Sequence, residues 1–484
     1  MHPHELVSEL RSFLPAESVL YEGEDLRPYE CDGLSAYRQT PMIVVLPQTE
    51  DEVIRILQIC HRTKTPVVPR GAGTGLSGGA LPHESGVLLS LAKLKKIVDL
   101  DPASRTARVQ PGVRNLSISE AAAPYGLYYA PDPSSQIACS IGGNVAENSG
   151  GVHCLKYGLT VHNILELRVI TLSGEILEIG GSGLDSPGYD LMAIMTGSEG
   201  MLGIVTEIVV KLTPSAEKAQ VVMAAFDDIR KAGDAVANVI GAGIIPAGME
   251  MMDRITTRAV EEYVHAGYNL DAAAILLCES DGTAEEVADE VLRMGEIMRQ
   301  SGAIEIKTSR DESERLRFWA GRKAAFPAAG RVSPDYYCMD GTIPRKNLAF
   351  VLTGIERLSW EYGLRCMNVF HAGDGNLHPL ILYDANQPGE LQKTEEFGAK
   401  ILEMCIAVGG TITGEHGVGI EKINQMCSQF THHELEMFHS VKAAFDPSGL
   451  LNPGKAIPTL RRCAEHGAMH VHRGEEKFPE LPRF

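Results

Sequence analysis

The sequence predicts an α+β protein with two or three hydrophobic cores. At 484 residues the chain is long enough for several domains of about 150 residues each. The first 215 residues are rich in glycine and short apolar strands, whereas longer helices alternate with strands from about residue 220. We therefore expect one domain over residues 1–215, a second over 216–425, and a C-terminal segment over 426–484 that closes with a polar tail.

Short apolar runs in the first 215 residues predict strands. Thr49 and Glu52 have the spacing of a capping box, so we expect a helix from there to about Cys60, between the first two strands. The domain thus begins as a βαβ unit. The expected strands cover residues 42–46, 66–69, 86–91, 164–172 and 203–212.

Beyond residue 220 the pattern predicts strands that alternate with helices. Repeated units of this length suit a sheet covered by helices on one face, as in ferredoxin-like α+β domains. The expected strands cover residues 220–226, 247–252, 273–279 and 303–307, and the helices cover 228–240, 254–266, 284–300 and 312–325.

The composition excludes several classes of partner and site. Lys and Arg number 44 against 63 Asp and Glu, a net charge of −19, so we expect no nucleic acid partner. No apolar run reaches the roughly 18 residues of a membrane helix, and the first residues lack the pattern of an export signal. The ten cysteines are scattered without a CxxC pair, which predicts no disulfides, no iron–sulfur cluster and a cytoplasmic location.

Residues 71–79 pack five glycines into nine positions directly after a predicted strand. Such a loop can bring backbone N–H groups close to a phosphate, because glycine tolerates positive φ and has no side chain to obstruct the approach. Gly73, Gly75 and Gly78 also match GxGxxG, but the next strand begins at Val87, too soon for the helix that a Rossmann unit needs. We therefore exclude a nicotinamide site. A glycine-rich surface turn is the alternative for this loop taken alone.

Two further segments have the same character. Residues 131–151 contain Pro-Asp-Pro-Ser-Ser, Ser-Ile-Gly-Gly-Asn and Asn-Ser-Gly-Gly, and residues 197–206 contain three more glycines. Few hydrophobic cores need so many small and polar residues in succession, whereas a long nucleotide lying against the main chain does. The three loops together are a more specific signal than any one of them.

These loops resemble the FAD-binding domain of the vanillyl-alcohol-oxidase and p-cresol-methylhydroxylase flavoproteins. The resemblance implies a two-lobed FAD-binding domain, a cap domain for the substrate, and a C-terminal segment that returns to the FAD-binding domain. In that family the first loop embraces the pyrophosphate, and the other two line the isoalloxazine and adenine. Some relatives attach the flavin covalently, and His153 and Cys154 lie in the second loop, but the branch resembled here holds FAD noncovalently.

The resemblance assigns FAD-binding residues in all three loops and at one position near the C-terminus. That last position, Asn452, is otherwise interpreted as part of a turn, with Pro453 and Gly454 making the bend. The assigned residues are Pro69, Arg70, Gly71, Ala72, Gly73, Thr74, Gly75, Leu76, Ser77, Gly78, Pro131, Asp132, Pro133, Ser135, Gly142, Gly143, Asn144, Asn148, Ser149, Gly150, Gly151, Tyr157, Gly158, Glu199, Gly203, Ile204, Val205 and Asn452.

Two histidines bracket the sequence His-Ala-Gly-Asp-Gly-Asn-Leu-His. Apolar strands are expected on both sides, at 367–370 and 380–383, and Asp-Gly between such runs predicts a hairpin. If these strands pair, His371 and His378 can face one point, in a geometry suited to a zinc-type ion. A hydrogen-bonded structural histidine is the alternative for each residue taken singly.

A second short segment, Gly-Glu-His-Gly, adds the carboxylate of Glu415 and the imidazole of His416. Two histidines and one glutamate would leave coordination positions open for a substrate. Spacing alone does not identify the metal. Three histidines in the tail are interpreted as structural residues: His466, His470 and His472.

The HxGDGNLH and GEHG motifs resemble those of the FAD-dependent 2-hydroxyacid dehydrogenases. In the metal-dependent members two histidines and the glutamate carry a divalent ion, usually zinc, and the adjacent histidine is the base. The resemblance thus implies the metal ligands His371, His378 and Glu415, with His416 as the catalytic base. It covers residues from about 40 to 455 and is strongest with the glycolate-oxidising subunits, through segments 319–327 and 334–342.

Arg322 lies on a predicted helix, and an arginine fork is a natural clamp for a carboxylate. The resemblance assigns it the substrate carboxylate, together with Asn376 and His416 as substrate-binding residues. A solvated helix arginine is the alternative. Relatives that act on dicarboxylates carry a lysine near residues 337–338 that is absent here. Lys323 or Arg331 could substitute for it.

The resemblance implies FAD-dependent oxidation of a small 2-hydroxy acid, foremost glycolate to glyoxylate. The alternatives are a D-lactate dehydrogenase, a non-catalytic flavin carrier within a redox complex, and a scaffold without flavin. Because no iron–sulfur run or nicotinamide site is visible, reduced flavin needs an external acceptor. The resemblance implies a second flavin-type subunit and an iron–sulfur subunit as partners, which would place the chain at the inner face of the cell membrane.

Overall fold

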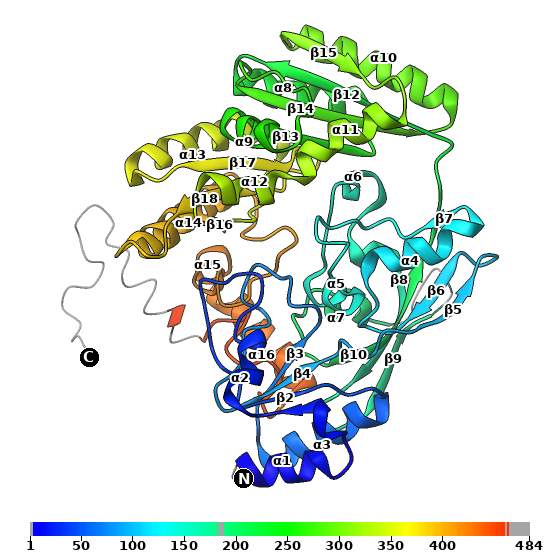
Figure 1. Cartoon of the computed structure of the whole chain (residues 1–484), viewed down its shortest axis with the longest axis vertical. Coiled ribbons are helices and arrows are strands. Elements are labelled where there is room, and N and C mark those ends of the chain that lie inside the picture. Colours follow the sequence, from blue (N-terminus) through cyan, green and yellow to red (C-terminus); the bar gives the residue numbers. More distant parts are fainter. Residues whose placement is uncertain (1–2, 182, 184–187, 460–461, 464–484) are drawn as a thin grey trace.

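The computed structural model describes residues 3–181, 183, 188–459 and 462–463. Within these residues the strands form sheets of four, five, two and seven strands. The three smaller sheets come from residues before 215 and the largest from residues after it, at opposite ends of the molecule (Figure 1). The predicted α+β class is confirmed. No helix in the described ranges is long and apolar enough to cross a membrane.

The four-stranded sheet contains the predicted βαβ start. Helix α3 (Glu50–Thr63) begins as expected, because the Glu52 N–H donates to Thr49 Oγ1 at 3.3 Å. The Glu52 carboxylate does not complete a capping box, since it accepts from the Gln48 N–H at 2.6 Å. The strands, in sheet order, are β1 (Val19–Leu20), β2 (Ile43–Val45), β4 (Val87–Ser90) and β3 (Val67–Arg70). Helices α1 (Pro3–Arg11) and α2 (Gly23–Leu26) precede β2.

The five-stranded sheet is antiparallel throughout. In sheet order the strands are β5 (Ile97–Asp101), β6 (Thr106–Val109), β10 (Ile204–Lys211), β8 (Ile164–Ile170) and β9 (Ile176–Gly180). Three of its strands, β5, β6 and β9, were not predicted. Nearby lie α4 (Asn115–Ala122), α6 (Cys154–Tyr157), α7 (Leu191–Met195) and the pair β7 (Leu127–Tyr128) and β11 (Thr213–Pro214).

Helix α5 (Ile141–Glu147) lies inside the second glycine-rich segment, which sequence patterns had treated as a loop. Two of its residues are glycines, which disfavour helix in isolation. Packing explains their presence, because a Cβ on Gly142 would come within 2.5 Å of Pro111 Cβ and 3.0 Å of its carbonyl oxygen. Residues 71–86, by contrast, form no helix, as the exclusion of a Rossmann unit required.

The seven-stranded sheet is also antiparallel throughout, and helices cover both of its faces (Figure 1). The expectation of helices on one face is wrong, because residues 221–226 are all apolar and β12 buries both of its faces. The strands are β15 (Glu305–Thr308), β12 (Lys218–Phe226), β14 (Ala274–Gly282), β13 (Gly248–Asp253), β17 (Cys366–His371), β18 (Pro379–Tyr383) and β16 (Asp335–Cys338).

The two helical layers pack on alternate side chains of the same strands. Val222, Ala224 and Phe226 share a core with one layer, which consists of α8 (Ile229–Gly241), α10 (Ala284–Gln300), α13 (Leu348–Tyr362) and α14 (Glu390–Ala407). Val221 and Met223 share a core with the other layer, which consists of α9 (Arg254–Val264), α11 (Glu312–Lys323) and α12 (Ala325–Val332).

The C-terminal segment crosses back to the first sheet. After α15 (Ile423–Gln429) and α16 (His432–Phe445), the Val67 N–H of β3 donates to the Leu450 carbonyl at 2.8 Å, and the Asn452 N–H donates to the Val67 carbonyl at 2.7 Å. The domain boundaries expected near 215 and 425 stay predictions. The tail histidines His466, His470 and His472 lie outside the described residues.

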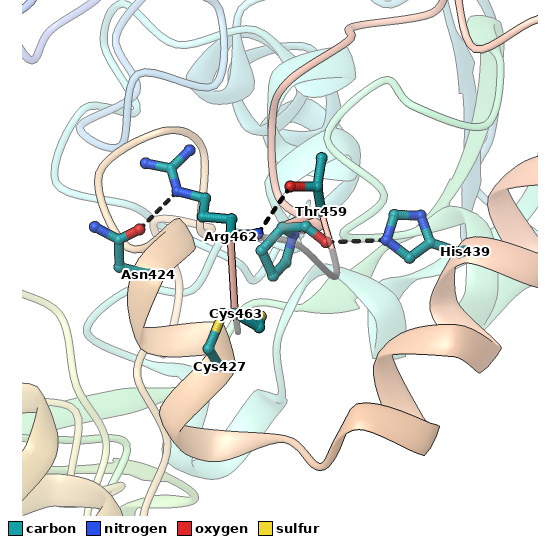
Figure 2. The surroundings of a disulfide bond; sticks show 7 residues. Asn424, Cys427, His439, Thr459, Arg462 and Cys463 are labelled. Carbon is teal, nitrogen blue, oxygen red and sulfur yellow. Dashed lines mark hydrogen bonds between the residues drawn. A yellow bond between two sulfur atoms is a disulfide. The ribbon is translucent and has the colours of Figure 1, made fainter. Parts of the chain in front are cut away.

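A disulfide joins Cys427 of α15 to Cys463 (Figure 2). The expectation of no disulfides is therefore wrong. The two cysteines are 36 residues apart in sequence, so no local spacing indicated the pairing. Arg462 beside the bridge donates to Asn424 Oδ1 at 2.7 Å, which adds a second contact between this segment and α15.

Candidate functional site

A cavity of about 430 Å³ lies where the glycine-rich loops face helices α11 and α12 and the loops that carry His378, Glu415 and His416. The structure thus brings the three loops and part of the histidine and glutamate set to one space. Predicted site residues that line it are Pro69, Arg70, Gly71, Ala72, Gly73, Thr74, Gly75, Leu76, Pro133, Ser135, Gly142, Gly143, Asn144, Ser149, Glu199, Gly203, Ile204, Val205, His378, Glu415 and His416.

The other predicted FAD-binding residues lie behind this lining. Ser77 accepts the N–H groups of Ile420 and Glu421 on its carbonyl, at 3.0 and 3.1 Å, and Asn452 Nδ2 donates to the carbonyls of Gly79 and Glu199, at 2.9 and 2.7 Å. These residues hold loops together and do not line the cavity. The set is Ser77, Gly78, Pro131, Asp132, Asn148, Gly150, Gly151, Tyr157, Gly158 and Asn452.

The first glycine loop presents free main-chain donors. Within the described residues, the backbone N–H groups of residues 71–79 donate no hydrogen bond to the chain. Seven of these nine residues line the cavity. The buried hydroxyl of Ser140, which also lines the cavity, has no hydrogen-bond partner. Unpaired amides of this kind are suited to a pyrophosphate, so the loop fits FAD.

His153 and Cys154 do not line the cavity. His153 Nδ1 lies 2.8 Å from Asp132 Oδ2, and its Nε2 lies 3.3 Å from Glu279 Oε1 of β14. Both ring nitrogens are therefore engaged, and His153 connects the second loop to the seven-stranded sheet.

Sequence analysis assigned no FAD-binding role to a further part of the lining. The buried carboxyls of Asp32 and Glu147 belong to it, as does the ring of Phe326, which lies 6.5 Å from that of His378. Nine of these residues lie within the three glycine-rich segments, which was the signal available for them. The missed residues are Asp32, Gly79, Ala80, Leu91, Pro111, Ser134, Ile137, Cys139, Ser140, Ala146, Glu147, Met195, Ser198, Gly200, Lys323, Phe326 and Pro327.

The predicted hairpin places two histidines side by side. Strand β17 pairs with β18 through Met367 and Leu380, so His371 ends one strand and His378 precedes the next. Their ring centroids are 5.0 Å apart. Glu415 Oε1 lies 3.4 Å from His371 Nε2 and 3.1 Å from His378 Nε2.

This trio fits a divalent ion. One ligand atom from each residue lies within 4.8 Å of the others, and both Nε2 atoms are buried without a hydrogen-bond partner. Two imidazoles and a carboxylate are the donor set typical of zinc sites that keep a position open.

His371 and Arg322 are held by one buried carboxylate. Glu250 of β13 is buried and lies 2.5 Å from His371 Nδ1, while Arg322 Nε of α11 donates to its other oxygen at 2.6 Å. Arg322 is 1% exposed, and its Nη2 has no hydrogen-bond partner. Glu250 therefore orients a predicted metal ligand and the predicted carboxylate clamp at the same time.

His416 stacks on His378, with ring centroids 4.9 Å apart and planes 6° apart. Burial lowers the pKa of His416 to about 4, so the ring is neutral at neutral pH. Asn376 lies beside the same loop, because a Cβ on Gly414 would overlap its side-chain nitrogen. The four predicted residues His371, His378, Glu415 and His416 thus meet at one point.

Two basic residues had been considered as substitutes for a missing lysine. Lys323 lines the cavity. Arg331 is exposed and lies over the Tyr263 ring at 5.7 Å, so it points elsewhere. Of the two, only Lys323 is placed to meet a group in the cavity.

Two family models match the chain: "FAD binding domain" over residues 41–180 and "FAD linked oxidases, C-terminal domain" over residues 215–456. The chain is 64% identical to glycolate oxidase subunit GlcD of Escherichia coli (strain K12), over 98% of this chain and 95% of that protein. It is 39% identical to GlcD of Bacillus subtilis (strain 168), over 88% and 91%.

A solved structure of p-cresol methylhydroxylase has a similar fold, with a TM-score of 0.79 at 18% identity, over 95% of this chain and 97% of that one. The likeness in fold agrees with the two-lobed architecture expected from the glycine loops. Taken with the matches over both halves of the chain, it leads to one assignment. The chain belongs to the family of FAD-linked oxidases that includes the GlcD subunits.

Proposed function

We propose that this chain oxidises glycolate to glyoxylate with FAD as the electron acceptor. The observation that carries the proposal is the cavity itself, because unpaired loop amides line one end and His378, Glu415 and His416 line the other. The GlcD relatives, named for glycolate oxidase, support this choice of substrate. We also propose the division into a FAD-binding domain (1–215), a cap domain (216–425) and a returning segment (426–484).

FAD would be held noncovalently, by residues 69–76 around the pyrophosphate and by the second and third loops along the rest of the molecule. His153 supports noncovalent binding, because both of its ring nitrogens already have carboxylate partners outside the cavity. When bound, FAD supplies the acceptor for the two electrons of the oxidation.

His371, His378 and Glu415 would hold a divalent ion such as zinc. A divalent ion at that position would lower the pKa of a substrate hydroxyl, as it does for bound water. Glu250 supports the assignment, because a metal-binding histidine usually donates its second N–H to a carboxylate.

The residues of the chain bind, orient and deprotonate the substrate. Arg322 pairs with the carboxylate of glycolate through Nη2, and Glu250 holds the guanidinium in place at Nε. His416 accepts the hydroxyl proton at Nε2, which lies 3.9 Å from Glu415 Oε1. Asn376 lies next to the same loop and completes the substrate-binding set. This geometry converts binding energy into orientation of the α-hydrogen.

D-lactate is the second candidate substrate. It differs from glycolate by one methyl group, which a hydrophobic pocket discriminates by about 1–3 kcal/mol. Phe326 lies close enough to His378 to contact such a group. Steady-state kinetics with glycolate, both lactates and D-2-hydroxyglutarate would rank the substrates, and activity with D-2-hydroxyglutarate would indicate a role for Lys323.

Reduced flavin would pass its electrons to partner subunits, one of a second flavin type and one carrying iron–sulfur clusters. The cysteines of this chain support an external acceptor, because they contain no closely spaced iron–sulfur run. Full activity of the isolated chain toward a quinone would argue against such partners.

The central test is anaerobic reduction of the bound flavin by glycolate, followed by visible absorbance. We expect bleaching in the wild type and near-complete loss of bleaching in His416→Ala with FAD still bound. The exposed His433 provides a matched control, and His433→Ala should bleach like the wild type. Bleaching that survives His416→Ala would favour a non-catalytic flavin carrier, and a colourless protein that cannot be reconstituted would exclude the proposal.

A further inference from the structure

Two buried carboxyl side chains meet beneath the loop that carries Glu415 and His416. Glu147 ends helix α5, and Glu199 follows helix α7. Both line the cavity, yet the reaction described above uses neither. The loop over residues 414–419 lies directly against them, since a Cβ on Gly417 would overlap Glu147 Oε2 and come within 3.1 Å of Glu199 Oε1.

Glu199 binds this loop as a carboxylate. Its two oxygens accept the N–H groups of Val418 and Gly419, each at 2.7 Å. Its own backbone is held on both sides, because its N–H donates to the Ala146 carbonyl at 2.8 Å and its carbonyl accepts from Asn452 Nδ2 at 2.7 Å. Glu199 adopts φ = 51°, a conformation that costs energy for a residue with a side chain.

Glu147 has no such donors. Glu147 Oε2 is buried without a hydrogen-bond partner. A Cβ on Gly79 would lie 3.0 Å from Glu147 Oε1 and 3.5 Å from Glu199 Oε2, so both carboxyl groups lie against this glycine. Both carboxyl groups lie against the same glycines and are shielded from water, so ionising both of them would cost much free energy. The one that accepts two N–H groups keeps the charge, so Glu147 carries the proton.

The charges around the pair agree with this assignment. Burial raises the pKa of Glu147 well above its ordinary value, and the neighbouring Glu199, Asp32 and Asp340 raise it further, against the opposing cation Lys422. Burial also leaves the pKa of Glu199 above its ordinary value, but the amides of residues 418 and 419, which Glu147 lacks, lower it, as do Lys422 and Lys455.

The opposite end of the loop is held from the cap side. Asp340 accepts the backbone N–H groups of Gly414, Glu415 and His416, at 3.1, 3.2 and 2.8 Å. The loop is therefore held by two carboxylates, Asp340 from the cap side and Glu199 from the flavin-binding side. Glu415 and His416 thus lie in the part of the loop that Asp340 holds, directly before the part that Glu199 holds.

We propose that Glu199, as a carboxylate, is a positioning residue that holds the loop of Glu415 and His416 against the flavin-binding side of the cavity, and that the neighbouring Glu147 is a neutral acid, which leaves the negative charge to Glu199. The proposal rests on the proposed function for its catalytic consequence. It assigns different protonation states to the two acids, so the same substitution has different expected effects at the two positions.

The test compares Glu199→Gln with Glu147→Gln in the FAD-bound protein, with Glu207→Gln as control. Glu207 is half-buried on β10 and is paired with Arg108, away from the loop. Three measurements are made: hydrogen–deuterium exchange of the peptide covering residues 414–419, the infrared carbonyl band of a protonated carboxylic acid, and the rate of flavin reduction by glycolate.

In Glu199→Gln the side-chain NH₂ faces one of the two backbone N–H groups of residues 418 and 419, so one hydrogen bond to the loop is lost. We therefore expect faster exchange at residues 418 and 419 and flavin reduction slowed about 10- to 100-fold. In Glu147→Gln a neutral amide replaces a neutral acid. We expect exchange at residues 418 and 419 like that of the control, because the two backbone N–H groups keep Glu199 as their acceptor, together with loss of the protonated-acid band.

Equal damage from both substitutions, or a protonated-acid band unchanged in Glu147→Gln, would overturn the proposal. If Glu199→Gln does not fold, the Glu147→Gln measurements still decide the protonation state. Exchange and infrared spectra need no turnover. Failure of the wild type to oxidise glycolate would therefore refute the proposed function while leaving these two readouts to judge the loop contact separately.

Discussion

The two ends of the cavity recognise their targets by different parts of the chain. At the glycine end, residues 71–79 offer main-chain amides that the chain itself leaves unpaired. At the histidine end, His371, His378 and Glu415 act through side chains, each buried or nearly so, and Glu250 and Asp340 hold them in place. The difference teaches where each end is vulnerable. Substitutions that add atoms should damage the glycine end, whereas a substitution that exchanges one side-chain atom should damage the histidine end.

The largest effect is expected from adding atoms at the glycine end. In Gly142→Val the new Cβ meets Pro111 at 2.5 Å and its carbonyl oxygen at 3.0 Å, so helix α5 must move away from the cavity wall. We expect the purified protein to lack flavin absorbance and to melt at a lower temperature. Gly23→Ala, which has no atom within 4 Å of its Cβ, should retain FAD. Normal FAD content in Gly142→Val would break the comparison.

Exchanging one side-chain atom at the histidine end should abolish oxidation of the substrate, while FAD remains bound. Glu250→Gln gives one of its two partners, His371 or Arg322, an NH₂ group in place of an acceptor. Because breaking a buried charged contact costs about 2–5 kcal/mol, we expect flavin reduction by glycolate to fall roughly 100-fold or more, with an unchanged flavin spectrum.

The matched control for this exchange is Glu305→Gln on the edge strand β15, where the carboxylate pairs with Lys307 near the surface. Its rate should stay within about twofold of the wild type. A Glu250→Gln protein that lost FAD but reduced normally after reconstitution would mean that the two ends are not separable in this way.

A smaller effect is expected at His153, which connects the second glycine-rich loop to the seven-stranded sheet. Burial lowers its pKa, but Asp132 and Glu279 outweigh burial and raise it to about 10, from an ordinary value of 6.5. Charged His153 therefore contributes its full stabilisation below pH 6.5, and this contribution is lost as the pH rises toward about 10. We expect the melting temperature of the wild type to fall more steeply over that range than that of His153→Gln. Parallel curves would contradict the assigned charge.

Local sequence signals identified most of what the cavity uses from the main chain. The glycine loop was predicted without tertiary information, because five glycines in nine residues after a strand tolerate positive φ and leave the backbone N–H groups open to a phosphate. The histidine hairpin was likewise predicted from Asp-Gly between two apolar runs, and the register of β17 with β18 confirms it. Helix α5 was missed, because two adjacent glycines disfavour helix in isolation and the contact of Gly142 with Pro111 is visible only in the tertiary structure.

The supporting carboxylates could not be predicted. Glu250 lies 121 residues from the histidine that it orients, and Asp340 lies more than seventy residues from the loop amides that it binds. Glu250 belongs to no motif, since a single acid in an apolar strand looks the same whether it is paired or exposed. Asp340 lies in segment 334–342, but nothing local indicates which amides it binds. The Cys427–Cys463 bridge was missed for the same reason.

The sequence by itself determined the chemistry present: a run of amide donors, three imidazoles, a glutamate and an arginine in recognisable local patterns. These depend on bonds and backbone angles within a few residues, so they can be read along the chain. Only the tertiary structure decided that Glu199 and Asp340 grip one loop from opposite sides and that Glu250 serves two partners. Such contacts join residues that are distant in the chain, and their energy depends on the water excluded when the parts pack together.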